Sequence, residues 1–180
     1  TNILDIKNGR LWQYNQSLEI YQCPADKLGI KSGGKTQLRV RSFSLNGMMG
    51  KNSDIGSPWN PHPNIRENLK FTDVVDPGTS QANFFIDEQS DPVPDLCSID
   101  DGYFAVNLGT WDWQNVPASR HGNGGVLSFA DGHGAQWHWM ESDTRSLKRS
   151  STGFTRSISG KNNRDLRKLK EASNALSAIK

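Results

Sequence analysis

Residues 120–140 read RHGNGGVLSFADGHGAQWHWM, and this stretch decides the fold. Two runs with apolar and aromatic content, 126–130 and 133–140, flank the dipeptide Asp131-Gly132. A two-residue Asp-Gly link between such runs is a strong β-hairpin signal, because a type I′ turn needs positive φ at both central positions. The sequence therefore predicts a two-residue hairpin in which Val126 faces Trp137.

Alternation along the second strand predicts one apolar and one polar face. Successive side chains of a strand point to opposite sides, so Trp137 and Trp139 share one face while Gln136 and His138 share the other. We expect the imidazole of His121 to bond a backbone carbonyl or a nearby acid. The hairpin residues interpreted as structural are His121, Gly124, Gly125, Asp131, Gly132 and His133.

The remaining elements follow from periodicity and from turn residues. Strict alternation predicts a half-buried strand over 38–45, and 82–87 and 102–106 read as two further strands. A short helix or extended entry is expected near 9–14 and a strand-like run over 20–26. A C-terminal helix packed on the sheet is predicted after Asn162 or Asn163, either of which can serve as its N-cap. Its apolar residues recur at helical spacing: Leu166, Leu169, Ala172, Leu176 and Ile179.

Composition bounds the fold class. The chain has 180 residues with 17 glycines and 8 prolines, which favours one domain rich in turns and disfavours an all-α fold. No window approaches the roughly 20 consecutive apolar residues of a membrane span. The chain begins at Thr1 without a methionine, so we expect that an upstream segment was cleaved or left out. The prediction is a single α+β domain over 1–180, with a small antiparallel sheet and a packed helix.

Charge divides that domain into two parts. Residues 145–180 carry ten lysines and arginines against two acidic residues, whereas 1–144, the sheet-rich body, carry a net charge of −6. The basic segment lacks interleaved aromatic residues, so a linker with a solvated C-terminal helix is favoured over a nucleic-acid patch. Its expected partner is the acidic body of a neighbouring copy.

Two cysteines, Cys23 and Cys97, lie far apart and outside any Cys-x-x-Cys pair, so the sequence gives no support for zinc-finger or thioredoxin-like chemistry. In an oxidising compartment a disulfide between them would close a loop of about 75 residues and contribute roughly 4 kcal/mol. Whether the two are bonded stays open at this point.

Six short strings occur in an order that resembles one protein family. They are GRLWQY at 9–14, YQCPAD at 21–26, RSFSLNG at 41–47, SIDDGYF at 98–104, the run from Pro117 to His133, and NRDL at 163–166. In this order they resemble the prepilin-type proteins with a His-x9-Asp-Gly motif, of the Verrucomicrobia and Planctomycetes type, which are related to type II secretion pseudopilins. The resemblance spans nearly the whole chain.

The resemblance implies a pilin-like globular head with a structural and not an enzymatic role. Members of the family carry a cleaved leader and an N-terminal apolar helix that anchors in the inner membrane and later packs in a filament. We expect this helix to be missing from the sequence given, which starts at Thr1. Other pilin or pseudopilin subunits and the secretion machinery are the implied partners. The periplasmic face of the inner membrane or an extracellular filament is the implied location.

Calcium is the candidate cofactor. Acidic residues at 87–101 supply the oxygen ligands that this hard cation needs, although without the spacing of an EF-hand. Major pseudopilins have a calcium-ordered loop, so the resemblance strengthens the case for the ion, but solvated acids and Asx-turns are the favoured interpretation. The candidate ligands are Asp87, Asp91, Asp100 and Asp101.

The sequence contains candidates for two other kinds of site. A metal site of His121, His133 and Asp131 is disfavoured because Asp131 is needed by the turn, and no Gly-x-Ser-x-Gly elbow indicates a nucleophilic serine. Most tryptophans are expected in the core, but three in loops are candidates for surface binding: Trp59, Trp111 and Trp113. The alternative function is therefore a secreted carbohydrate-binding or glycan-hydrolysing module.

Overall fold

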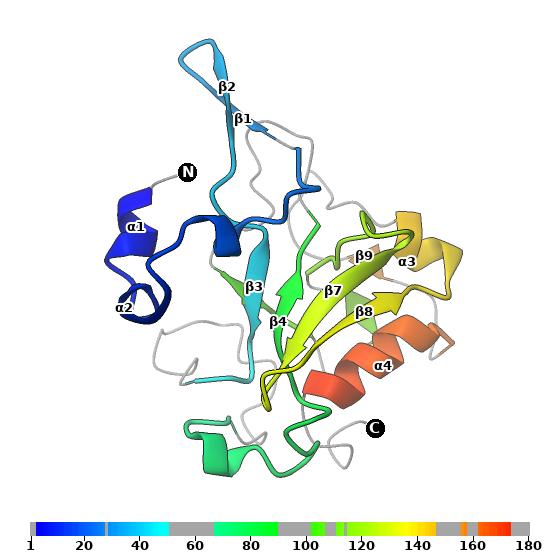
Figure 1. Ribbon diagram of the computed structural model, residues 1–180. Helices are drawn as coiled ribbons and strands as arrows, with labels where there is room; N and C mark the ends of the chain where they lie inside the picture. Colours follow the sequence, from blue (N-terminus) through cyan, green and yellow to red (C-terminus); the bar gives the residue numbers. More distant parts are fainter. Residues whose placement is uncertain are drawn as a thin grey trace.

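The computed structural model describes residues 3–27, 29–50, 67–89, 102–106, 111–113, 115–146, 156–157 and 162–173. It contains a five-stranded sheet in the order β5-β3-β4-β7-β8, with helix α4 against one face (Figure 1). These elements are β3 (Phe43–Asn46), β4 (Asn83–Asp87), β5 (Tyr103–Phe104), β7 (Gly124–Phe129), β8 (Gly134–His138) and α4 (Arg164–Ser173). The predicted α+β content is confirmed, but the sheet is mixed because β3 and β5 are parallel.

The predicted hairpin exists as β7 and β8, but its register differs by one residue from the prediction. Val126 lies opposite Gln136 and Gly125 lies opposite Trp137. The loop has three residues, Ala130 to Gly132, since the backbone N–H of Phe129 donates to His133 O at 2.9 Å. Gly132 has φ +93°, as the left-handed residue of such a loop requires.

A contact distant in sequence explains the longer loop. The amide of Ala130 donates to Ala82 O at 2.9 Å and the amide of Asp131 donates to Thr79 O at 3.2 Å. In a two-residue turn the Ala130 amide would have bonded across the hairpin instead. In the predicted register Val126 shares a face of the sheet with Trp137. In the observed register Val126 lies on the other face, and its neighbour Leu127 takes the core face, where it is 1% exposed. Trp137 and Trp139 do share a face, as predicted, and Trp139 is buried.

The prediction of one strand over 38–45 is wrong. The segment divides between β2 (Lys35–Leu38), which pairs with β1 (Gly29–Ser32) in a hairpin that projects from the molecule, and β3 (Figure 1). The side chains of β2 are all exposed, so alternation there reflects no core. In contrast, Ser42, just before β3, and Ser44, within it, are fully buried. Both hydroxyls have an acceptor there, since Ser42 donates to Asp26 and Ser44 donates to Glu88.

The N-terminal segment forms short helices: α1 (Ile3–Lys7), α2 (Trp12–Asn15) and the 3₁₀ turn η1 (Glu19–Tyr21). The helix expected near 9–14 is therefore present in part, whereas the strand-like run over 20–26 is not a strand. Pro24 and Ala25 form a turn in which the Asp26 amide donates to Cys23 O at 2.9 Å. This turn brings Cys23 and Asp26, both buried, against the sheet.

The C-terminal helix begins as predicted. The side-chain oxygen of Asn163 accepts a hydrogen bond from the Leu166 amide at 2.8 Å, which caps α4. Leu166 and Leu169 are buried in the main core with Ile86 and Leu127. Asn46 donates to the carbonyl of Ser173 at 3.3 Å, so β3 holds the end of the helix. Leu176 and Ile179 lie outside the described residues.

The remaining elements are small. They are η3 (Phe71–Asp73), α3 (Ser142–Ser146) and the pair β6 (Asp112–Trp113) and β9 (Arg156–Ser157). Among the described helices, none is long and apolar enough to cross a membrane.

Candidate functional site

Strand β7 separates the two parts of the His-x9-Asp-Gly motif. His121 begins a tight turn in which Gly122 and Asn123 both have positive φ, and His121 and Gly124 exchange backbone hydrogen bonds of 3.1 Å. The type I′ geometry expected at Asp131-Gly132 is thus found at the other end of the strand. A six-residue strand spans roughly 20 Å, so His121 and Asp131 do not converge.

Asp87, the last residue of β4, contacts both Arg120 and His121 just before the start of β7. Its side chain has 0% exposure, and Arg120 donates to both carboxylate oxygens, with Nε at 3.1 Å from Oδ2. Arg120 also donates to the carbonyl of Glu88 at 2.7 Å and lies 3.7 Å from Asp26. One guanidinium therefore faces two buried carboxylates.

Backbone pairing fixes the position of Arg120. The Ala118 amide donates to Asp87 O and the Gln89 amide donates to Val116 O, both at 2.8 Å, so residues 116–120 run beside the end of β4. Glu88 points to the other face of the sheet, where Asn115 donates to it at 2.7 Å. The two adjacent carboxylates are thus held separately.

His121 brings a cysteine to the same cluster. Its Nε2 lies 3.1 Å from Asp87 Oδ2 and 3.1 Å from Cys23 Sγ, and Cys23 is a buried free thiol. In a Cys-His-Asp relay the thiol and the carboxylate would contact different ring nitrogens. Here both contact Nε2, so the arrangement does not provide a proton relay through the imidazole.

Burial sets the electrostatics of this end. Burial raises the pKa of Asp87 above its usual 3.8, against the opposing hydrogen bond and charge of Arg120. Burial alone would lower the Arg120 pKa, but the hydrogen bond and charge of Asp87 outweigh it and raise that pKa. The guanidinium consequently stays charged.

The other end of β7 is exposed. Asp131 Oδ1 accepts the His133 amide at 3.1 Å and lies 2.6 Å from His133 Nδ1. These hydrogen bonds lower the pKa of Asp131. The His133 ring stacks on Phe129 with centroids 4.3 Å apart. The Asp131 carboxylate therefore bonds within the turn, at the opposite end of β7 from His121.

The two motif glycines at 124 and 125 allow close packing. A Cβ on Gly124 would lie 2.0 Å from the carbonyl oxygen of Trp137, and one on Gly125 would lie 3.0 Å from that of Ala118. Trp139 Nε1 donates to the same Ala118 carbonyl at 2.7 Å. A side chain at either position would therefore displace its neighbours.

The candidate surface tryptophans are placed differently from the prediction. Trp113 has 2% exposure and belongs to the core, which corrects its assignment as a surface-binding residue. Trp111 is half-buried, with Lys170 Nζ 4.1 Å and Arg167 Cζ 5.9 Å from its ring centroid. Trp59 lies outside the described residues. A sugar-stacking platform therefore gains no support from the two described residues.

Of the candidate calcium ligands, only Asp87 lies among the described residues. Its oxygens face Arg120 and His121, so it belongs to the ion-pair cluster and not to an acidic loop. Asp91, Asp100 and Asp101 lie outside the described residues, as does Cys97, the candidate disulfide partner of Cys23.

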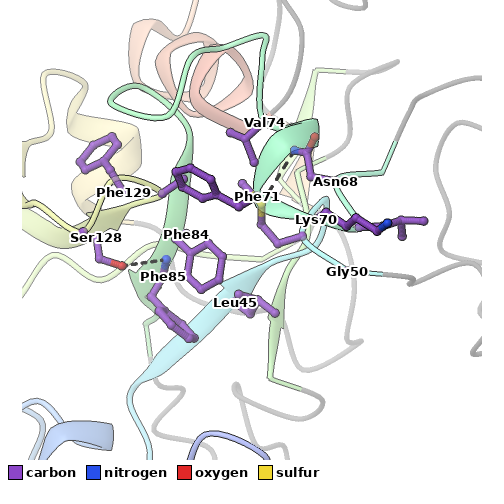
Figure 2. A pocket seen from close by; sticks show the side chains of 14 residues that line it. Leu45, Gly50, Asn68, Lys70, Phe71, Val74, Phe84, Phe85, Ser128 and Phe129 are labelled. Atoms are coloured by element: carbon purple, nitrogen blue, oxygen red, sulfur yellow. Dashed lines mark hydrogen bonds between the residues drawn. The ribbon is translucent and has the colours of Figure 1, made fainter. Parts of the chain in front are cut away.

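An apolar pocket of about 720 Å³ lies on the same face of the sheet as Asp87, opposite α4. Figure 2 shows Leu45, Phe84 and Phe85 from the sheet beside Phe71 and Val74. Of its lining side chains, Ser128 uses its Oγ to accept the Phe85 amide at 3.1 Å. Most of its lining is apolar, so the pocket suits an apolar group.

Sequence reasoning did not identify Cys23 and Asp87 as the partners of His121, nor Arg120 as the partner of Asp87. Their contacts join residues up to 98 positions apart, which no local pattern reveals. One usable signal is Asp87 directly after the apolar run 84–86, because a charge at the end of a buried strand requires a partner. Comparison with family models, curated proteins and solved structures finds no match to this chain.

Proposed function

We propose that this chain is the globular head of a pilin-like structural subunit, related to the pseudopilins of type II secretion, that acts by assembly and protein contact. The observation that supports it most is the use of the His-x9-Asp-Gly motif. His121 holds the buried cluster at one end of β7 and Asp131 holds the turn at the other, so the motif acts on the protein's own structure. A scaffold of this kind needs no turnover.

In this proposal an N-terminal apolar helix supplies the membrane anchor and the main filament contacts, and the head supplies partner choice. Other pilin-like subunits and the secretion machinery are the partners. The subunit resides at the periplasmic face of the inner membrane or in an extracellular filament. The sheet, with α4 packed on one face, forms the core of this head (Figure 1).

The complete gene provides the test. We expect the reading frame upstream of Thr1 to encode a short basic leader and about 20 apolar residues. Coexpression with a prepilin peptidase should shorten the product, and the processed protein should sediment with sheared filaments. A reading frame with an ordinary secretory signal and no apolar stem, or a processed product that stays entirely in the soluble fraction, would overturn the proposal.

A further inference from the structure

Three atoms of different chemistry meet in front of the His121 ring. Cys23 Sγ and Asp87 Oδ2 each lie 3.1 Å from His121 Nε2, and all three ligand atoms lie within 4.8 Å of one another. A ring nitrogen has a single in-plane lone pair or proton, which can be directed at one neighbour only. Two neighbours on one nitrogen therefore surround the position that a metal ion bound to Nε2 would occupy.

The distances suit a small ion. Zinc bonds of 2.0 to 2.3 Å in tetrahedral geometry place ligand atoms roughly 3.3 to 3.7 Å apart. The two separations from Nε2 are 3.1 Å, a few tenths of an ångström shorter than this, and the sulfur and the carboxylate oxygen lie within 4.8 Å of each other. Sulfur, imidazole nitrogen and carboxylate oxygen together suit zinc, whereas calcium requires oxygen ligands only.

Charge does not exclude a dication despite the neighbouring guanidinium. Asp26 has 2% exposure, and its Oδ2 lies 3.7 Å from Arg120, so it balances that positive charge. The remaining groups, the Asp87 carboxylate and a Cys23 thiolate, would then neutralise one Zn²⁺. The His121 side chain is 27% exposed, whereas the Asp87 side chain is fully buried.

We propose that Cys23, Asp87 and His121 form a zinc-binding site, with water in the fourth position. The ion would join three segments, the turn at 23–26, the end of β4 and the turn before β7, and so would fix the N-terminal segment to the sheet. This site is independent of the pilin-like function, because a head of any function could carry it.

The test uses the whole chain with Cys97→Ser, which leaves Cys23 as the only cysteine of the two. Zn²⁺ should bind at about one ion per chain and raise the melting temperature, since a ligand of the folded state stabilises it. Co²⁺ in place of Zn²⁺ should give a thiolate-to-metal charge-transfer band in the near ultraviolet. That band can arise from Cys23 alone.

Matched variants locate the ion. Cys23→Ser and His121→Asn should each abolish the Zn²⁺-dependent shift, and His133→Asn, which changes the histidine at the other end of β7, should retain it. If either site variant fails to fold, alkylation of Cys23 in the Cys97→Ser protein replaces it, and stoichiometric Zn²⁺ should slow that reaction at least tenfold. Absence of saturable binding, a shift that persists in both site variants, or an unprotected Cys23 thiol would overturn the proposal.

Discussion

The two ends of β7 carry the same pair of residue types, a histidine and an aspartate, in opposite surroundings. Asp87 beside His121 has a side chain with 0% exposure, whereas His133 and Asp131 are 46% and 34% exposed. A buried charge that loses its partner is costly, while water screens an exposed pair. We therefore expect substitutions at the buried end to lower the free energy of unfolding more than substitutions at the exposed end, where the residues shape the turn.

The largest effect should follow from Arg120→Ala. Asp87 and Asp26 would remain buried without their guanidinium, which costs about 3–5 kcal/mol of unfolding free energy. Urea denaturation followed by circular dichroism measures this loss.

Arg164→Ala is the matched control, because Arg164 also forms an ion pair, with Glu141, but its side chain is 61% exposed. We expect no measurable change in its urea midpoint. Equal losses in the two variants would show that burial does not distinguish these pairs.

The next largest difference should be between alanine substitutions of Gly124 and Gly132, the glycines near the two ends of β7. Gly124→Ala places a Cβ 2.0 Å from the backbone oxygen of Trp137, so the strands must separate at a cost of about 3 kcal/mol. Gly132→Ala meets nothing within 4 Å but requires φ +93°, which costs about 1 kcal/mol. Chemical denaturation of both variants checks the order, and a greater loss for Gly132→Ala would reverse the comparison.

His121→Ala should have a smaller effect than Arg120→Ala. It removes one partner of Asp87 and Cys23, at a cost of about 1–3 kcal/mol, or several degrees in melting temperature for a domain of this size. His133→Ala loses an exposed contact and a ring stack, so its shift should be smaller. Differential scanning fluorimetry in metal-free buffer compares the two; equal shifts would contradict the assignment of stability to the buried end.

The smallest expected effect is a pH dependence of opposite sign at the two ends. The lowered pKa of Asp131 stabilises the fold above the unfolded value near 3.8, and this contribution is lost as the pH falls through the folded pKa. The raised pKa of Asp87 acts in reverse, so its contribution declines as the pH rises from 3.8 through the folded pKa.

Melting temperatures of the wild type, Asp87→Asn and Asp131→Asn across acidic pH measure these contributions. The difference between Asp131→Asn and the wild type should vanish at the lowest pH, and Asp87→Asn should lack the decline. The same sign of pH dependence for both carboxyls would refute the contrast.

Residue patterns within a short segment predicted where helices and strands occur better than they predicted the register between strands. The Asn163 cap and the β7–β8 hairpin follow from residues close in sequence, and both are present. The hairpin register was wrong because Ala130 and Asp131 bond residues 79–82, and such a distant partner leaves no trace in the Asp-Gly dipeptide.

The buried cluster shows the same limit. Periodicity placed Asp87 at the end of a strand but could not indicate that Arg120 and Cys23 approach it, since these residues come from segments far apart in the chain. His121 was expected to bond a nearby acid, and the structure places Asp87 there at 3.1 Å. The general requirement for a partner was therefore predictable, and its identity was not.

The fixed length of β7 constrains how this sequence can change. Both turns are tied to other parts of the molecule, His121 to Asp87 and Ala130 to Ala82, so neither can slide to absorb an inserted or deleted residue. One added residue between them would exchange the inward and outward side chains, exposing Leu127 and Phe129 to water. Sequence drift in this strand is therefore limited to replacements, whereas the surface hairpin β1–β2 is free to vary in length.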